Sequence, residues 1–310
     1  MKVKKYILGF LVLALILVLR TPCVAQITDS IKFDHGYLHY HEYGSKKLPA
    51  VLILTGGPGN SYRQLEGVAE ALSPKFRSIL LEQRGTGKSM PQPLDATTIT
   101  LEFVTNDLKT VLDSLHLKKS IIMGHSWGGM LAMNFASQYP ERVAHLILVA
   151  PGPHKNAKEG FEILDSNRNH TRSFVEDQRL KVLNASIKAN TADSLAINEA
   201  QKLVRRAYIY ANPIPEALFQ KINVENNSKT ASLLLGDVFR DYNMSQSLNN
   251  YTGKIDVIVG RQDVVGFFSH ELKQDVPKVK LHWVNACGHF PMYEQPRQFY
   301  KILYKTLNVR

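Results

Sequence analysis

Short apolar runs separated by helix-like segments occupy most of the chain from residue 50 onward. The runs at 50–54, 78–81, 121–123, 145–149, 255–259 and 279–284 are nearly continuous rather than alternating. Continuous apolarity indicates strands covered on both faces, as in a parallel sheet. Segments with helical character lie between the runs, at 62–72, 101–115, 126–139 and 296–307. This alternation predicts an α/β fold with a mostly parallel sheet and helices on both of its faces.

The pattern changes at two places. Residues 37–43 alternate aromatic or apolar with polar side chains, and Gly36 before them predicts a turn that pairs them with residues 31–34 in an antiparallel hairpin. Between residues 153 and 248 the strands stop and helix formers predominate. We therefore predict an eight-stranded sheet in a core of residues 26–152 and 249–310. A helical cap of residues 153–248 is inserted between its sixth and seventh strands.

The first 25 residues have the organisation of a secretory signal peptide. A basic start is followed by an apolar block at 6–19 and by a small residue, Ala25, at the predicted cleavage site. An uncleaved anchor would need a longer block of about 20 residues. A lipoprotein site at Cys23 lacks the preceding small residues. We expect an exported protein, periplasmic or secreted, without a stable membrane anchor after cleavage.

Charge and cysteine content narrow the function classes. The net charge is +11, and removal of the four lysines and arginines in residues 1–25 leaves +7. Basic residues are interleaved with acidic ones and form no stripe with aromatic residues, so no nucleic-acid partner is expected. Only Cys287 survives processing, which excludes a disulfide framework in a monomer. No cluster has the spacing of metal ligands, and we expect neither a metal nor a cofactor.

One short segment imitates a nucleotide-binding loop. Gly87-Lys-Ser89 matches the end of a phosphate-binding loop, but Glu82 occupies the position where that pattern requires a glycine. The prolines at 91 and 93 exclude a helix directly after it. We therefore exclude nucleotide binding.

The most informative motif is Gly-His-Ser-Trp-Gly-Gly at 124–129, between an apolar run and a helix-like segment. In that context the motif is a strained turn that exposes the hydroxyl of Ser126. A serine hydroxyl becomes a nucleophile when a base takes its proton and a carboxylate orients that base. Asp263 and His289 each follow a predicted strand, in the chain order expected for this sheet. We predict Ser126 as nucleophile, His289 as base and Asp263 as the orienting acid.

Other residues of the same types are less well placed. His282 and Asp256 fall inside predicted strands, and Asp275 falls beyond a predicted helix. Cys287 has no comparable turn and is expected to pack beside His289. These residues are therefore assigned structural roles.

An oxyanion that forms during acyl transfer needs backbone donors. One N–H is expected from Trp127, which follows the nucleophile. The other is expected from the glycine-rich loop Thr55-Gly-Gly-Pro-Gly59 after the run at 50–54, with Gly57 as the donor. Paired glycines allow the backbone to approach a ligand closely.

Three motifs together resemble the prolyl aminopeptidase (proline iminopeptidase) branch of the α/β-hydrolase superfamily. They are Gly56-Gly-Pro-Gly59, Glu82-Gln-Arg-Gly85 with Gly87 and Ser89, and the motif at 124–129. The resemblance implies an α/β-hydrolase fold and gives Ser126, Asp263, His289, Gly57 and Trp127 the roles assigned above.

The resemblance also bears on the substrate. In that branch, a helical cap carries glutamates that bind the free amine of the substrate, and Glu225 is the nearest match; an exposed acidic residue at a helix end is the alternative. Thr55 and Glu82 depart from the family pattern, which has histidine and aspartate there.

Three hypotheses for the function follow. The first is an exported serine aminopeptidase that releases an N-terminal residue, of the proline type, from small peptides through an acyl-enzyme on Ser126. The second is an esterase or lactonase that acts on a small acyl substrate with the same residues, since a fold does not choose its substrate. The third is a non-catalytic binding protein on a hydrolase scaffold.

Overall fold

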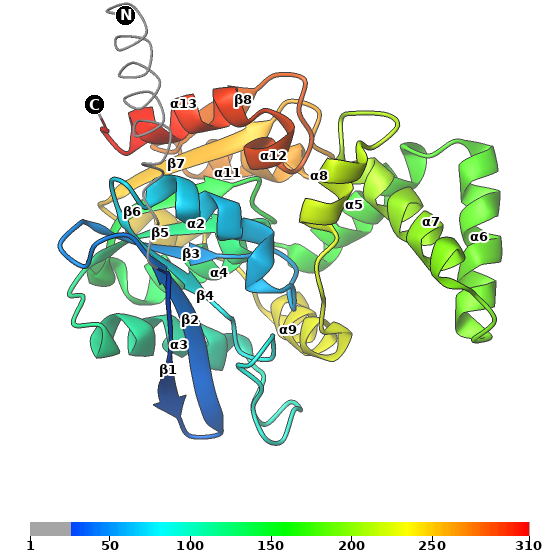
Figure 1. The fold of residues 1–310 in the computed structure, drawn as a ribbon. Coiled ribbons are helices and arrows are strands. Elements are labelled where there is room, and N and C mark those ends of the chain that lie inside the picture. Colours follow the sequence, from blue (N-terminus) through cyan, green and yellow to red (C-terminus); the bar gives the residue numbers. More distant parts are fainter. Residues whose placement is uncertain (1–25, 310) are drawn as a thin grey trace, which may run out of the picture.

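The computed structural model describes residues 26–309, and the predicted signal peptide at 1–25 lies outside these residues. Eight strands form one sheet in the order β1-β2-β4-β3-β5-β6-β7-β8 (Figure 1). The strands are β1 (Gln26–Phe33), β2 (Gly36–Tyr43), β3 (Ala50–Leu54), β4 (Arg77–Leu81), β5 (Ser120–His125), β6 (Val143–Val149), β7 (Lys254–Gly260) and β8 (Lys280–Val284).

The first two strands form the predicted antiparallel hairpin, and β2 also pairs antiparallel with β4. All other neighbours in the sheet are parallel. β1 begins earlier than the predicted strand at 31–34. Its first four residues are exposed, with Ile27 as their single apolar side chain, and they are ordered by a continuous ladder that reaches the pair Gln26–Tyr43.

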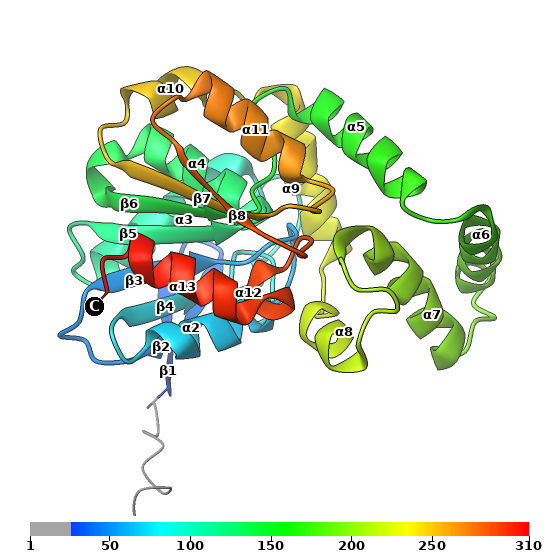
Figure 2. The same cartoon turned by 90° about the horizontal axis from the view of Figure 1, so that it is seen from above.

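Helices cover both faces of the sheet because the central strands are apolar on both sides. All residues of β3 and β4 are buried. One face carries α2 (Glu66–Leu72), α12 (Pro291–Glu294) and α13 (Pro296–Thr306), with the short 3-10 helix η1 (Tyr62–Leu65) before α2. The other carries α3 (Leu101–Ser114), α4 (Trp127–Gln138), α10 (Ser245–Asn250) and α11 (Gly266–Asp275) (Figure 2).

A helical insertion lies between β6 and β7, as predicted. It contains α5 (Ala157–His170), α6 (Phe174–Lys188), α7 (Ser194–Arg205), η3 (Arg206–Tyr208), α8 (Glu216–Ile222) and α9 (Ser228–Arg240). α6 and α7 form a hairpin that projects from the body of the molecule (Figure 1). This hairpin has a small apolar cluster of its own, built on Leu180, Leu183 and Ala200.

The C-terminal part of the insertion packs against the core. Leu234 and Val238 of α9 belong to the apolar cluster on the face of the sheet that carries α3 and α4. The hydroxyl of Tyr242 donates to the Met130 carbonyl. The predicted domain boundary at residues 248 and 249 falls inside α10. Taken together, the topology and the insertion confirm the predicted fold class.

Among the described helices, none has the length and apolar character that a membrane span requires.

Candidate active site

Ser126 lies on the turn between β5 and α4, with φ 54° and ψ −116°. A non-glycine residue rarely adopts such a backbone conformation, and it persists where the surrounding structure fixes it. The Ser126 amide donates to the Val149 carbonyl, and the Ser126 carbonyl accepts from Gly129. Ser126 is partly exposed, whereas the other five residues of 124–129 are buried. The turn therefore presents this one side chain.

The glycines of the motif are required by close backbone contacts. A Cβ at Gly124 would lie 2.1 Å from the Gly128 carbonyl oxygen, and one at Gly128 would lie 2.2 Å from the Leu54 oxygen. Both distances are far shorter than any real Cβ contact. The sharp turn at Ser126 therefore depends on glycine at these positions.

His289 follows β8, and Asp263 follows β7, so both lie at the carboxyl edge of the sheet with Ser126. The Nδ1 atom of His289 lies 3.0 Å and 3.2 Å from the two carboxylate oxygens of Asp263. A carboxylate accepts hydrogen bonds, so Nδ1 carries the hydrogen and Nε2 is left as a base. Asp263 is itself held by the Val265 amide, which donates to Oδ1 at 3.0 Å. This orientation is the one that general-base catalysis needs.

His125, next to Ser126, joins the two loops. Its Nε2 lies 2.9 Å from the His289 carbonyl oxygen, to which it donates. Burial lowers the pKa of His125 to about 3, so the ring is neutral at physiological pH. The contact fixes the Ser126 turn against the His289 loop without adding a charge.

The His289 loop is also fixed by the cap and by α12. The His289 amide donates to the Tyr208 carbonyl at 2.7 Å. The Glu294 carboxylate accepts from the amides of Gly288, Phe290 and Tyr210, at 3.1, 3.0 and 2.7 Å. Burial raises the pKa of Glu294, although the three amides oppose that shift. Both neighbours of His289 are thus bonded to one side chain.

Ser126 and His289 line one cavity of about 350 Å³, within the range of about 300–1,000 Å³ that is usual for small-molecule sites. The core and the cap both contribute to its wall. The lining residues are Gly56, Gly57, Pro58, Asn60, Gln64, His125, Ser126, Arg205, Tyr208, Asn226, Ala231, His289 and Phe290.

The predicted oxyanion donors lie beside this cavity. Gly57 lines it with φ 121°, a conformation that favours glycine. The amide of Trp127 is in the first turn of α4, where N–H groups have no partner within the helix and the helix dipole favours negative charge. These two positions are suited to stabilise an oxyanion.

Two glutamines, neither of which the sequence analysis assigned, hold the oxyanion region together. Gln64 Oε1 accepts from the Gly56 amide at 3.0 Å. Gln83 donates to the carbonyl of Thr55 at 2.9 Å and accepts from the Trp127 indole at 3.1 Å. Gln83 therefore connects the loop of Gly57 with the start of α4. Its place in the quoted segment Glu82-Gln-Arg-Gly85 was the available sequence signal.

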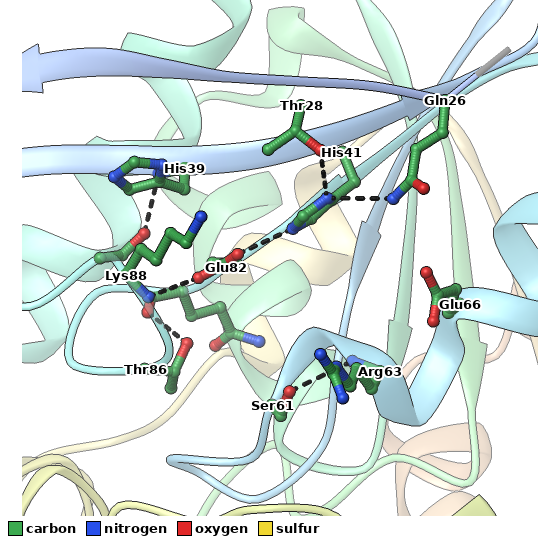
Figure 3. Close-up of polar contacts among 12 residues, drawn as sticks. Gln26, Thr28, His39, His41, Ser61, Arg63, Glu66, Glu82, Thr86 and Lys88 are labelled. Carbon is green, nitrogen blue, oxygen red and sulfur yellow. Dashed lines mark hydrogen bonds and ion pairs between the residues drawn. The ribbon is translucent and has the colours of Figure 1, made fainter.

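The loop that carries Gln83 is anchored by Glu82, as Figure 3 shows. Glu82 Oε1 lies 2.7 Å from His41 Nε2, and Oε2 accepts from the Lys88 amide at 2.6 Å. On its other side, His41 Nδ1 lies 3.0 Å from the Thr28 hydroxyl. Burial would raise the pKa of Glu82, but the hydrogen bonds from His41 and Lys88 outweigh it and hold the pKa below its usual value.

Glu225, the predicted amine-binding residue, lies outside this cavity. Its side chain is exposed and lines an adjoining hollow, and Asn226 contributes to both. The Glu225 carbonyl accepts from the Ser61 amide at 2.9 Å. Its role in binding stays a prediction.

The residues assigned structural roles are engaged elsewhere. Asp256 is bonded to His145 at 2.7 Å and to His282 at 2.6 Å, inside the sheet. Cys287 is buried, and burial raises the pKa of its thiol, which makes a thiolate nucleophile unfavourable. Within residues 26–309, no three His, Cys, Asp or Glu side chains are grouped so as to hold a metal ion.

The family described as alpha/beta hydrolase fold matches residues 49–296. The match covers most of the chain, and the protein belongs to this family. It is a hydrolase, as the family and the relatives described next indicate.

Its relatives catalyse different reactions. A 2-hydroxy-6-oxononadienedioate/2-hydroxy-6-oxononatrienedioate hydrolase of Paraburkholderia phymatum is 27% identical over 279 residues, covering 86% of this chain and 89% of that protein. A proline iminopeptidase of Heyndrickxia coagulans is 26% identical over 267 residues, covering 83% and 90%. Epoxide hydrolase 4 of Homo sapiens is 35% identical over 139 residues, covering 44% and 36%.

Solved structures agree on the fold. A proline iminopeptidase-related protein of Thermus thermophilus superposes with a TM-score of 0.71 at 18% identity, covering 92% of this chain and 98% of that one. The proline iminopeptidase of Mycobacterium smegmatis gives 0.69 at 18% identity, covering 91% and 98%. The predicted resemblance to the superfamily is confirmed, with proline iminopeptidases among the similar proteins.

Proposed function

We propose that the protein is an exported serine hydrolase that cleaves a small acyl substrate through an acyl-enzyme on Ser126. One observation carries the proposal. Ser126 and His289 line the same cavity, and Asp263 holds the His289 ring so that its Nε2 atom is a free base.

The reaction has two steps. In the first, the Ser126 oxygen attacks the acyl carbon while His289 takes the hydroxyl proton, and the leaving group departs with that proton. In the second, water attacks the acyl-enzyme while His289 takes a proton from it, and His289 returns a proton to Ser126. The amides of Gly57 and Trp127 stabilise the oxyanion in both steps. The products are a carboxylic acid and an alcohol or amine.

The peptide form of this reaction is the release of an N-terminal residue, of the proline type, from small peptides. The likeness to proline iminopeptidases over most of the chain supports it. Glu225 is the candidate partner of the substrate amine; it lines the adjoining hollow, and Asn226 lines both that hollow and the cavity.

The ester form is supported by a different observation. The residues that line the cavity include no carboxylate, so a free amine has no anionic partner beside Ser126. An ester or other small neutral or anionic acyl compound needs none.

Replacement of the nucleophile tests the proposal. Ser126→Ala is expected to lower kcat/KM by at least about 10³-fold and to abolish labelling by a fluorophosphonate probe. Ser137→Ala, at the far end of α4, is the matched control and should keep both the kcat/KM and the labelling of the unmodified enzyme. Labelling of Ser126→Ala at the level of the unmodified enzyme would place the nucleophile elsewhere.

A substrate panel separates the two forms of the reaction. Proline p-nitroanilide, its N-acetyl derivative and short-chain p-nitrophenyl esters are compared by kcat/KM. Preference for the free amine supports the aminopeptidase, and equal cleavage of the blocked substrate contradicts it.

The proposed export is tested separately. Sequencing of the mature N-terminus, expected at Gln26, tests the predicted cleavage of the signal peptide.

A further inference from the structure

Arg205 is a cation in the cavity wall that has no partner among the residues that the structure describes. It is the last residue of α7 and lines the cavity with Ser126 and His289. Its side chain is partly buried, and burial lowers its pKa, yet it makes no hydrogen bond or ion pair with any group of residues 26–309. The cap thus places a guanidinium in the wall of the cavity that Ser126 also lines.

Two arginines that are more deeply buried than Arg205 have carboxylate partners. Arg77 pairs with Glu42 at 2.8 Å, and Arg84 binds Asp107 through two nitrogens at 2.8 Å and 2.5 Å. Such pairing is expected, because a desolvated charge without a counter-ion is costly. Arg205 is only partly buried and has no such partner among the described residues, and an anion that enters the cavity with the substrate would supply one.

The rest of the cavity is consistent with an anionic ligand. Its lining contains no carboxylate, and His125 is neutral. Asp263 lies behind His289 and is already bonded to that ring. The N-terminal end of α4, at Ser126, adds a partial positive charge. A free carboxylate on the substrate would therefore meet no carboxylate among the residues that line the cavity, and Arg205 is the charged side chain among them.

We propose that Arg205 binds a carboxylate of the substrate at a distance from the bond that is cleaved, so that the enzyme selects small acyl compounds carrying a free carboxylate. This inference rests on the proposed reaction at Ser126. A guanidinium suits the role because its planar donors bind both oxygens of a carboxylate.

The carboxylate could belong to either half of the substrate. On the acyl side it would be the second carboxylate of a dicarboxylic acid monoester. On the leaving-group side it would be the C-terminal carboxylate of a dipeptide. Two matched pairs distinguish these sources: mono-p-nitrophenyl adipate against its methyl ester, and prolyl-alanine against prolyl-alaninamide.

The test compares kcat/KM within each pair for the unmodified enzyme and for Arg205→Gln. We expect the unmodified enzyme to prefer the anion in one pair by about 10–100-fold, the contribution of a charge-assisted hydrogen bond. Arg205→Gln should lose that preference, because its kcat/KM falls much further on the anionic member of the pair than on the neutral one. Arg179→Gln, which removes an exposed charge from α6, is the control and should keep the preference.

Two results overturn the inference: no preference for the anion in either pair, or a preference that Arg205→Gln retains. Neither affects the proposed function, provided that the neutral substrates are cleaved and Ser126→Ala is inactive.

A binding measurement decides the matter if no substrate of the panel is cleaved. Calorimetric titration with adipate should show binding to the Ser126→Ala variant and a loss of at least about tenfold in affinity when Arg205→Gln is added. Equal affinity of the two variants for adipate, or no binding by either, overturns the inference.

Discussion

Single side chains determine how the reacting groups of this hydrolase are held. Ser126 has a strained backbone that the glycines around it make possible. His289 has no such constraint of its own, and its position depends on contacts to its backbone. The amide of His289 is bonded to Tyr208, its carbonyl to His125, and both of its neighbours to Glu294.

Glu294 is therefore a positioning residue for the proposed base. In Glu294→Gln, the side-chain NH₂ would face a backbone N–H, so at least one of the three contacts is lost. We expect kcat to fall on the order of tenfold with KM little changed, because a misplacement of about 1 Å can cost about 10²-fold in rate. Steady-state kinetics on a neutral ester measure both constants.

Glu141→Gln, an exposed change of the same kind, is the control for this prediction. Unchanged kcat in Glu294→Gln, or a rise in KM that accounts for the whole effect, would mean that Glu294 only stabilises the fold. A Glu294→Asp variant that recovers part of kcat would support the positioning role.

At the scale of elements, the segment 82–89 connects the antiparallel edge of the sheet to the oxyanion region. Glu82 bonds both to His41 of β2 and to the Lys88 amide (Figure 3). The adjacent Gln83 reaches Thr55 and Trp127. The buried carboxylate therefore shapes a loop whose next residue supports the site.

Glu82→Gln is expected to destabilise the fold by about 1–3 kcal/mol, the cost of leaving a buried polar group unsatisfied. Because Gln83 shares the loop, kcat/KM should fall as well. Urea unfolding at neutral pH measures the first effect, with Glu162→Gln on the exposed face of α5 as the control. A variant as stable as the control would show that the His41 and Lys88 contacts contribute little.

The elements also show where sequence reasoning succeeds and where it stops. β3 and β5 are recognisable from the sequence because their residues are apolar on both faces, and Ser126 and Asp263 because each follows such a strand. His289 follows β8, whose residues are mostly only partly buried, and its signal is the glycine-flanked loop. The sequence of α6 shows no clear apolar stripe that would predict a buried helix face, since Phe174, Val175 and Val182 are apolar but exposed. No local sequence pattern marks Arg205 as a residue of the cavity, because its position there depends on how α7 packs relative to the core.

At the scale of the whole molecule, a buried polar cluster couples stability to pH. Asp256 of β7 is bonded to His145 of β6 and His282 of β8. Burial would raise the pKa of Asp256, but the hydrogen bonds from both histidines outweigh it and hold the pKa well below its usual value. A depressed pKa means that the folded state favours the ionised carboxylate.

The carboxylate of Asp256 therefore stabilises the fold fully above its unfolded pKa of about 3.9, and this stabilisation is lost as the pH falls toward the lower folded value. Asp256→Asn should lower the free energy of unfolding by about 1–3 kcal/mol at pH 7, with a smaller difference at pH 3. Urea unfolding at both pH values tests this. A difference that grows as the pH falls would contradict it.

The two parts of the chain make separate contributions to the cavity. Ser126, Asp263 and His289 come from turns at the edge of the sheet, whereas Arg205 comes from an inserted segment whose outer hairpin has its own apolar cluster. Sequence changes in that hairpin can therefore reposition Arg205 while the turns of the sheet stay as they are; the segment of the insertion at Tyr208, whose carbonyl accepts from the His289 amide, has no such freedom.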